Sequence, residues 1–229
     1  MTIFKQIICL ANSRKIGGRC IAGKELVEDK QIGRWVRPVS NREHNEVSER
    51  EYCYEDGNEP SVLDIIEVPL LYATPKEYQQ ENWLLDPEYW WEKVGDITWE
   101  DVRQIVDPVE PLWINNFSTF HGINDYIPNE DTNSLRSSLR LIFVDRLEIS
   151  VFDPGASFNN PKRRVQGRFQ YGGLDYWLWV TDPIYENKYL ALKNGNYVIG
   201  ESIITISLGK TQGDRAYKLI ASIIQPHEN

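Results

Sequence analysis

Two groups of cationic and aromatic residues carry the chemistry that this sequence offers. The first group lies near the N-terminus and consists of Asn12, Ser13, Arg14, Lys15, Arg19, Arg34, Trp35 and Arg37. The second group lies in the second half of the chain and consists of Arg163, Arg164, Arg168, Phe169, Tyr171, Trp177 and Trp179. Cationic side chains contact phosphates and aromatic rings stack on bases. Both groups are therefore candidate surfaces for binding single-stranded nucleic acid.

The distribution of charge leaves a second interpretation open. The net charge is −9, which opposes nonspecific binding of nucleic acid. Residues 1–42 carry a net +6, residues 43–135 carry −18 and residues 136–229 carry +3. In the second interpretation, Trp35 is a core residue and the arginines pair with the acidic middle. The acidic middle can also dock a basic protein partner.

Catalytic and metal-binding patterns do not stand out. The histidines, His44, His121 and His227, show no local Ser-His-Asp or Cys-His arrangement. Cys9, Cys20 and Cys53 lack C-x-x-C spacing, which argues against a disulfide framework and a zinc site. Cys9 and Cys20 lie in apolar strand-like runs, so we expect these two to be small core residues. Gly209-Lys210-Thr211 lacks the upstream glycine of a phosphate-binding loop. The sequence favours a non-enzymatic protein without a cofactor or a metal.

Hydrophobic alternation predicts short strands at both ends of the chain and helices between them. In the middle, Thr74, Asp86 and Thr98 each carry the signals of a helix start. Asp182-Pro183 predicts a further helix to about residue 192. Strands are predicted over residues 3–11, 19–27, 33–39, 62–73, 139–152, 163–171, 175–181, 197–208 and 215–225.

These elements predict an α+β, strand-rich fold without regular strand–helix alternation. The strand count favours two small five-stranded barrels. We expect a first barrel over residues 1–75, a helical, acidic, Trp-rich connecting segment over 76–135, and a second barrel over 136–229.

Several motifs resemble one family along nearly the whole chain. CLANSRK, GGRCIAG and GRWVRPVS in the first forty residues, DYWLWVTDP, and the closing SLGKTQGDRAYKLIASII are similar to the bacterial dual OB-containing domain family. The resemblance implies two OB folds. It also suggests a place in a bacterial defence or nucleic-acid-processing system.

Three functions follow as hypotheses. The first is recognition of single-stranded DNA or RNA, or of a nucleotide-like ligand, without catalysis. The second is a protein–protein adaptor that docks through its acidic middle, and the third is a nucleic-acid-processing enzyme with an unrecognised site. The N-terminus shows no pattern of a secretory signal, and no apolar stretch approaches the roughly 20 residues of a membrane helix. We therefore expect a cytoplasmic protein with no membrane partner.

Overall fold

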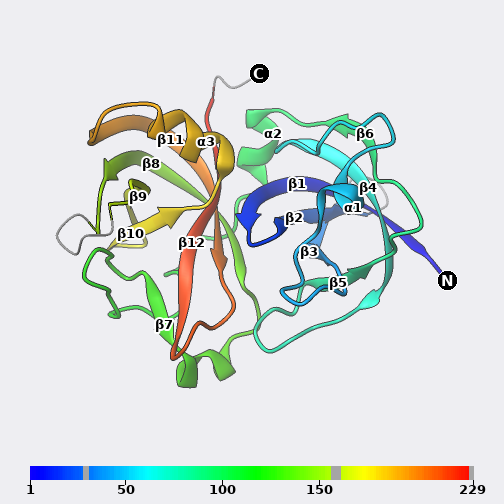
Figure 1. The fold of residues 1–229 in the computed structure, drawn as a ribbon, viewed down its shortest axis with the longest axis horizontal. Helices are drawn as coiled ribbons and strands as arrows, with labels where there is room; N and C mark the ends of the chain where they lie inside the picture. Colours follow the sequence, from blue (N-terminus) through cyan, green and yellow to red (C-terminus); the bar gives the residue numbers. More distant parts are fainter. Residues whose placement is uncertain (28–30, 156–160, 227–229) are drawn as a thin grey trace. The chain divides into compact units, whose positions relative to one another are not determined.

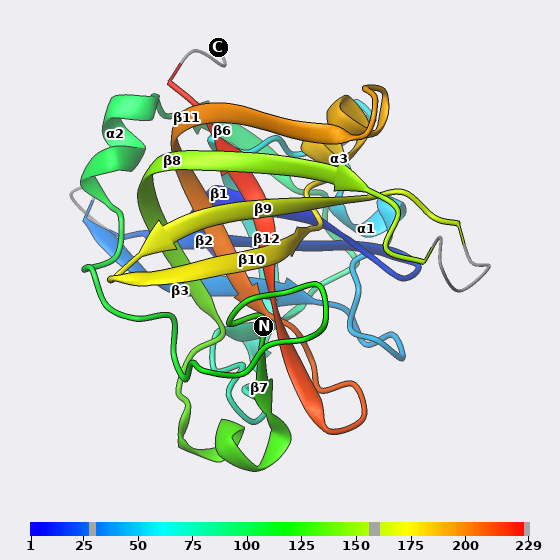
Figure 2. The same cartoon turned by 90° about the vertical axis from the view of Figure 1, so that its left-hand side faces the viewer.

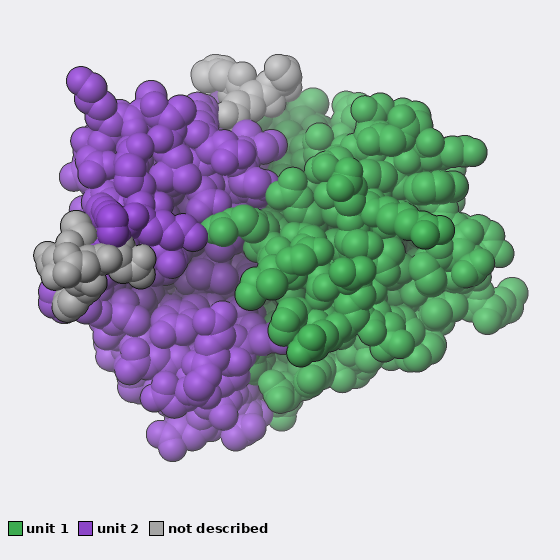
Figure 3. Space-filling model, in the orientation of Figure 1, with its two compact units in different colours: residues 1–105, 136–138 green, residues 106–135, 139–229 purple. Residues whose placement is uncertain are grey.

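The chain forms two compact units, each with its own hydrophobic core. The computed structural model describes residues 1–27, 31–155 and 161–226. Unit 1 comprises residues 1–105 and 136–138, and unit 2 comprises residues 106–135 and 139–229 (Figure 3). Residues 76–105 thus belong to unit 1, and residues 106–135 belong to unit 2.

Unit 1 is a small closed barrel with one additional strand (Figure 1). β1 pairs antiparallel with both β2 and β4, β2 pairs with β3, β4 pairs with β5, and a parallel pairing of β3 with β5 closes the ring. β6 extends the sheet beside β4. The described residues of unit 1 contain β1 (Ile3–Lys15), β2 (Gly18–Leu26), β3 (Ile32–Val39), α1 (Glu49–Tyr52), β4 (Asp64–Ala73), β5 (Asn82–Leu85), β6 (Glu92–Asp96) and α2 (Trp99–Gln104).

The core of unit 1 comes from alternate residues of these strands, because successive side chains of a strand point to opposite faces. Ile7, Ile21 and Ile66 are fully buried in it, and the large side chain of Trp91 is buried in the same cluster. Cys9 is buried in this cluster, as the sequence predicted, whereas Cys20, predicted to be a core residue as well, is only partly buried. Cys53 is also buried in the cluster.

Unit 2 repeats the same strand order. β8 pairs antiparallel with β9 and β11, β9 pairs with β10, β11 pairs with β12, and a parallel pairing of β10 with β12 closes the ring. Figure 2 shows β8, β9 and β10 side by side. The described residues of unit 2 contain β7 (Tyr126–Pro128), the 3-10 helix η2 (Asn129–Ser134), β8 (Leu139–Phe152), β9 (Arg164–Tyr171), β10 (Leu174–Val180), α3 (Pro183–Leu190), β11 (Gly195–Leu208) and β12 (Arg215–Ile224).

Both rings have the connectivity of a five-stranded OB barrel, with a helix between the third and fourth strands. In unit 2 this helix is α3, and Asp182 begins it by accepting hydrogen bonds from the backbone N–H groups of Ile184 and Tyr185. The strand-rich fold that the sequence predicts is confirmed.

The predicted helical connecting segment is wrong. Of the three expected helix starts, Thr98 begins a helix, the short α2. The segment after Thr74 contains β5, and the segment after Asp86 contains β6. Burial decides this outcome, because Leu85 and Trp91 reach the core of unit 1 from this stretch. Among the described residues, no helix has the length and apolar character needed to cross a membrane.

Candidate nucleic-acid interface

The N-terminal cationic loop is a tight hairpin between β1 and β2. Asn12 and Ser13 are held by the chain itself, because the Asn12 amide donates to Pro60 O at 2.8 Å and the Ser13 hydroxyl donates to Cys20 O at 3.3 Å. Arg14 is exposed and Lys15 is partly buried. Burial lowers the pKa of the Lys15 ammonium below its ordinary value.

Backbone conformation explains the first glycine of this hairpin, and packing explains the second. Gly17 adopts a φ of +80°, which favours glycine. A Cβ on Gly18 would lie 2.2 Å from the backbone oxygen of Val47. Arg19 pairs with Val47 through two backbone hydrogen bonds, and its guanidinium lies 3.4 Å from a carboxylate oxygen of Glu59. The hairpin thus rests on residues of its own unit.

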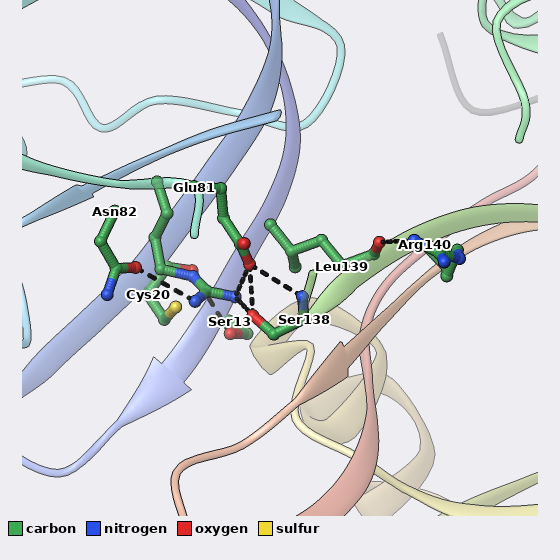
Figure 4. Close-up of polar contacts among 8 residues, drawn as sticks. Ser13, Cys20, Glu81, Asn82, Ser138, Leu139 and Arg140 are labelled. Atoms are coloured by element: carbon green, nitrogen blue, oxygen red, sulfur yellow. Dashed lines mark hydrogen bonds and ion pairs between the residues drawn. The ribbon is translucent and has the colours of Figure 1, made fainter. Parts of the chain in front are cut away.

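Arg37 is engaged in the interior of unit 1 and is only 3% exposed. Its Nη2 lies 3.2 Å from Glu81 Oε1 and donates to Ser138 Oγ at 2.9 Å, while its Nη1 lies 3.3 Å from Asn82 Oδ1. Figure 4 shows Glu81 and Ser138 directed toward each other. For Arg37 the structure supports pairing with the acidic middle, so this residue is not available to a ligand.

The remaining N-terminal candidates divide between surface and interior. Arg34 is exposed on β3, whereas Trp35 is partly buried and its indole N–H has no hydrogen-bond partner among the described residues. The Lys24 ammonium lies 5.7 Å from the Trp35 ring centroid and donates to Ile105 O. Unit 1 therefore brings few of its predicted cations together on one exposed surface.

The C-terminal candidates separate cleanly into two faces of the sheet β8–β9–β10. Phe169 and Tyr171 point inward to the core of unit 2, and Phe169 stacks on Tyr176 with ring centroids 5.4 Å apart. These two rings are therefore not free to stack on a base. Arg164 and Arg168 lie on the opposite, outward face of β9.

Two Arg–Trp pairs lie on this outward face. The Arg168 guanidinium is 4.2 Å from the Trp177 ring centroid, and the two residues are direct partners in the β9–β10 register. Two residues further along β10, Trp179 has Arg164 5.6 Å from its ring centroid. All four side chains are at least partly exposed. Such stacks combine a planar cation with an aromatic ring.

Arg163, the neighbour of Arg164, has a structural role instead. Its guanidinium donates to Leu190 O at 2.9 Å, to Leu192 O and to Asn194 Oδ1 at 2.7 Å. Leu190 is the last residue of α3 and Leu192 follows it, so Arg163 places a cation at the C-terminal end of the helix, where backbone carbonyls lack helical partners.

Three aromatic rings that the sequence analysis did not identify lie in a row beyond Trp179; they belong to Phe152, His121 and Phe120. Phe152 lies 5.7 Å from Trp179 between ring centroids, His121 lies 5.6 Å from Phe152, and Phe120 lies 4.8 Å from His121. The His121 Nε2–H donates to Pro154 O at 3.2 Å. Phe120 is 89% exposed. The available sequence signal was a phenylalanine within a polar, turn-rich stretch, where no apolar alternation predicts that it is buried.

A hollow of about 370 Å³ opens on the outward face at the other end of the Arg–Trp row. It is lined by Asp145, Arg146, Glu148, Arg168, Phe169, Gln170, Asp175 and Trp177, all from β8, β9 or β10. Within the described part of the chain, no group of three or more His, Cys, Asp or Glu residues is arranged to hold a metal ion.

These features define a protein with two OB-like barrels, the second of which exposes paired arginines and tryptophans on its second and third strands. The family model of the dual OB-containing domain matches residues 5–223, and the chain belongs to this family. The match confirms the resemblance that the sequence motifs indicated. No curated protein and no solved structure matches the chain.

Proposed function

We propose that this protein binds single-stranded nucleic acid through the outward face of β9 and β10 in unit 2. The observation that carries the proposal is the pair of Arg–Trp stacks, Arg168 on Trp177 and Arg164 on Trp179. OB barrels bind oligonucleotides on their second and third strands, which are β9 and β10 in this unit.

The chemistry of this face suits a single strand better than a duplex. Unstacked bases can lie on aromatic rings or guanidinium planes, and each such stack contributes roughly 1–3 kcal/mol. Arg164 and Lys162 are exposed at one end of the row, where they can contact phosphates. Phe120, Phe152 and Trp179 offer further ring surface beside them.

Fluorescence anisotropy with a labelled fifteen-nucleotide oligothymidine or oligouridine tests this proposal across a series of salt concentrations. We expect affinity to fall with rising salt, because bound phosphates release counterions. Arg164→Gln should weaken binding and reduce the slope of log K against log salt by about 0.7 for each phosphate that is no longer neutralised. Trp177→Ala should weaken binding roughly tenfold at every salt concentration.

The matched control is Arg50→Gln, which removes an exposed arginine from α1 in unit 1. It should leave both affinity and salt slope unchanged. If no strand binds at low salt, or if Arg50→Gln and Arg164→Gln have equal effects, the proposal fails.

A further inference from the structure

The hollow beside Arg168 and Trp177 has the size and walls of a pocket for one planar ring system. Its volume of about 370 Å³ lies near the lower end of the roughly 300–1,000 Å³ that ligand pockets occupy. Residues from three adjacent strands line it, so the ordered sheet fixes its shape.

A stacked cation and aromatic ring line one side of the hollow. One rung of the sheet places Glu148 on β8 opposite Arg168 on β9, and Arg168 opposite Trp177 on β10. The Arg168 guanidinium lies over the Trp177 ring, and its Nε donates to Gln166 Oε1 at 3.1 Å, which fixes its orientation. Gln166 is fully buried and donates in turn to His121 O at 2.6 Å. A nucleobase can stack on such a fixed plane.

The wall next to this plane is rich in hydrogen-bond acceptors. Glu148 is partly buried, and its carboxylate makes no hydrogen bond or ion pair with any residue that the structure describes. Arg168 stands directly opposite but is turned onto Trp177. Asp145 and Asp175 add two more carboxylates, and Arg146 adds a guanidinium donor at the rim.

A carboxylate only accepts hydrogen bonds, and its two oxygens suit two parallel N–H donors. Among the four common bases, guanine alone presents two adjacent donors on its Watson–Crick edge, N1–H and the N2 amino group. Adenine and cytosine present one amino group beside an acceptor, and uracil and thymine present one N–H between two carbonyls. An arginine also suits the O6 and N7 acceptors of guanine.

We infer that the hollow is a guanine-selective subsite for one base of a bound single strand. The base stacks on the Arg168–Trp177 plane, and the Glu148 carboxylate accepts from N1–H and N2–H. Arg146, which also lines the hollow, donates to O6 or N7. The inference rests on the proposed function and adds base selectivity to it.

Binding of the full-length protein to ten-nucleotide oligothymidine strands with one central G, A, C or inosine tests the inference. Fluorescence anisotropy should show at least about tenfold tighter binding of the strand with G, since a good bidentate contact discriminates by roughly this factor or more. Inosine, which lacks the N2 amino group, should lose most of this preference. Glu148→Gln should bind all four strands alike, because its amide replaces one acceptor with a donor.

The control is Glu130→Gln, which removes the same charge from an exposed site of unit 2 outside the hollow. It should keep the preference for G.

Equal binding of all four strands by the wild-type protein, with Arg164→Gln still weakening that binding, would overturn the guanine subsite and leave the proposed function standing. Failure to bind any strand would overturn both. Tight binding of an arginine-rich peptide that Glu148→Gln abolishes, without any preference for G, would assign the hollow to a basic protein partner instead.

Discussion

Arg37 shows that a residue suited to phosphate can serve the protein interior. Its charge is balanced by Glu81, and both side chains are 4% exposed. The Ser138 backbone N–H and hydroxyl also donate to the Glu81 carboxylate, so both partners of the ion pair have further hydrogen bonds. A buried pair of this kind is sensitive to the loss of one partner, because the other charge is left uncompensated.

We therefore expect Glu81→Gln to lower the free energy of unfolding of unit 1 by about 3–5 kcal/mol. Urea unfolding monitored by tryptophan fluorescence measures this change. The control is Glu59→Gln, which breaks the more exposed Arg19–Glu59 pair and should cost less than about 1 kcal/mol. The double variant Arg37→Met with Glu81→Gln should recover part of the loss. Equal effects of Glu81→Gln and Glu59→Gln would contradict this account.

The site could be predicted from the sequence only in part, and β9 and β10 show why. Alternation along β9 correctly separates Arg164 and Arg168 from Phe169 and Tyr171. In β10, however, Trp177 and Trp179 on one face and Tyr176 and Leu178 on the other are all apolar or aromatic. Periodicity separates these faces but does not say which one is buried. The rings of Phe120, His121 and Phe152 come together only through the tertiary fold.

Local helix signals illustrate a similar limit at the scale of elements. Thr98 and Asp101 form the expected capping box, with the Thr98 N–H donating to Asp101 Oδ2 at 2.9 Å. Asp86 has the same kind of sequence context, and its Oδ1 accepts from the Glu88 N–H at 3.2 Å, yet the strand β6 follows instead of a helix; its Oδ2 accepts from the Thr2 hydroxyl at 2.7 Å. Short helices are marginal without tertiary support. Strand pairing and burial of Trp91 therefore outweigh the cap at Asp86.

The segment before β7 is attached to the second barrel by a buried lysine that no local sequence pattern distinguishes. Lys218 on β12 is 1% exposed, and its ammonium donates to Ile114 O at 2.7 Å and Asn115 Oδ1 at 2.8 Å. Its backbone N–H donates to Asp125 O at 2.8 Å. Burial lowers the pKa of Lys218 to about 7.

This lysine gives a pH dependence of stability with a definite sign. An unfolded lysine keeps its ordinary pKa of 10.5, so between pH 7 and 10.5 the unfolded state holds more protons than the folded state. The free energy of unfolding therefore rises with pH in this window, by about 1 kcal/mol per pH unit from this group. Lys218→Met should remove this contribution.

Urea unfolding at pH 7, 8 and 9 gives the free energy of unfolding of both proteins. The wild-type value minus the Lys218→Met value should increase with pH. Taking the difference cancels other groups that titrate in the same range, such as Lys15. The control Lys193→Met changes an exposed lysine and should follow the wild-type slope. Parallel stability curves for Lys218→Met and wild type would show that Lys218 does not titrate in this window.

At the scale of the whole molecule, the sequence predicted two strand-rich barrels because each has a regular series of alternating segments ended by turns. The assignment of the middle of the chain could not be predicted in the same way. Residues 76–105 complete unit 1 and residues 106–135 complete unit 2, while Arg136–Ser138 returns to unit 1. Such a discontinuous division depends on long-range contacts, such as those of Ser138 with Glu81, which leave no local pattern.

This division predicts which part of the chain can fold as the second barrel. Leu112 is fully buried in the core of unit 2, and its N–H donates to the Tyr176 hydroxyl at 3.1 Å. β7 pairs with β12 through residues 126–128, and Ile114 and Asn115 satisfy the Lys218 ammonium. A fragment that starts at residue 136 would lack all of these interactions, exposing core surface and leaving a buried ammonium without partners.

We therefore expect a fragment of residues 106–229 to unfold cooperatively in urea and to show the near-ultraviolet circular dichroism of packed aromatic rings. A fragment of residues 136–229 should show neither, although it contains β8 to β12. The two fragments differ only by residues 106–135, so the comparison isolates their contribution. An equal urea midpoint for both would mean that the five-stranded ring is stable alone and that residues 106–135 only cover it.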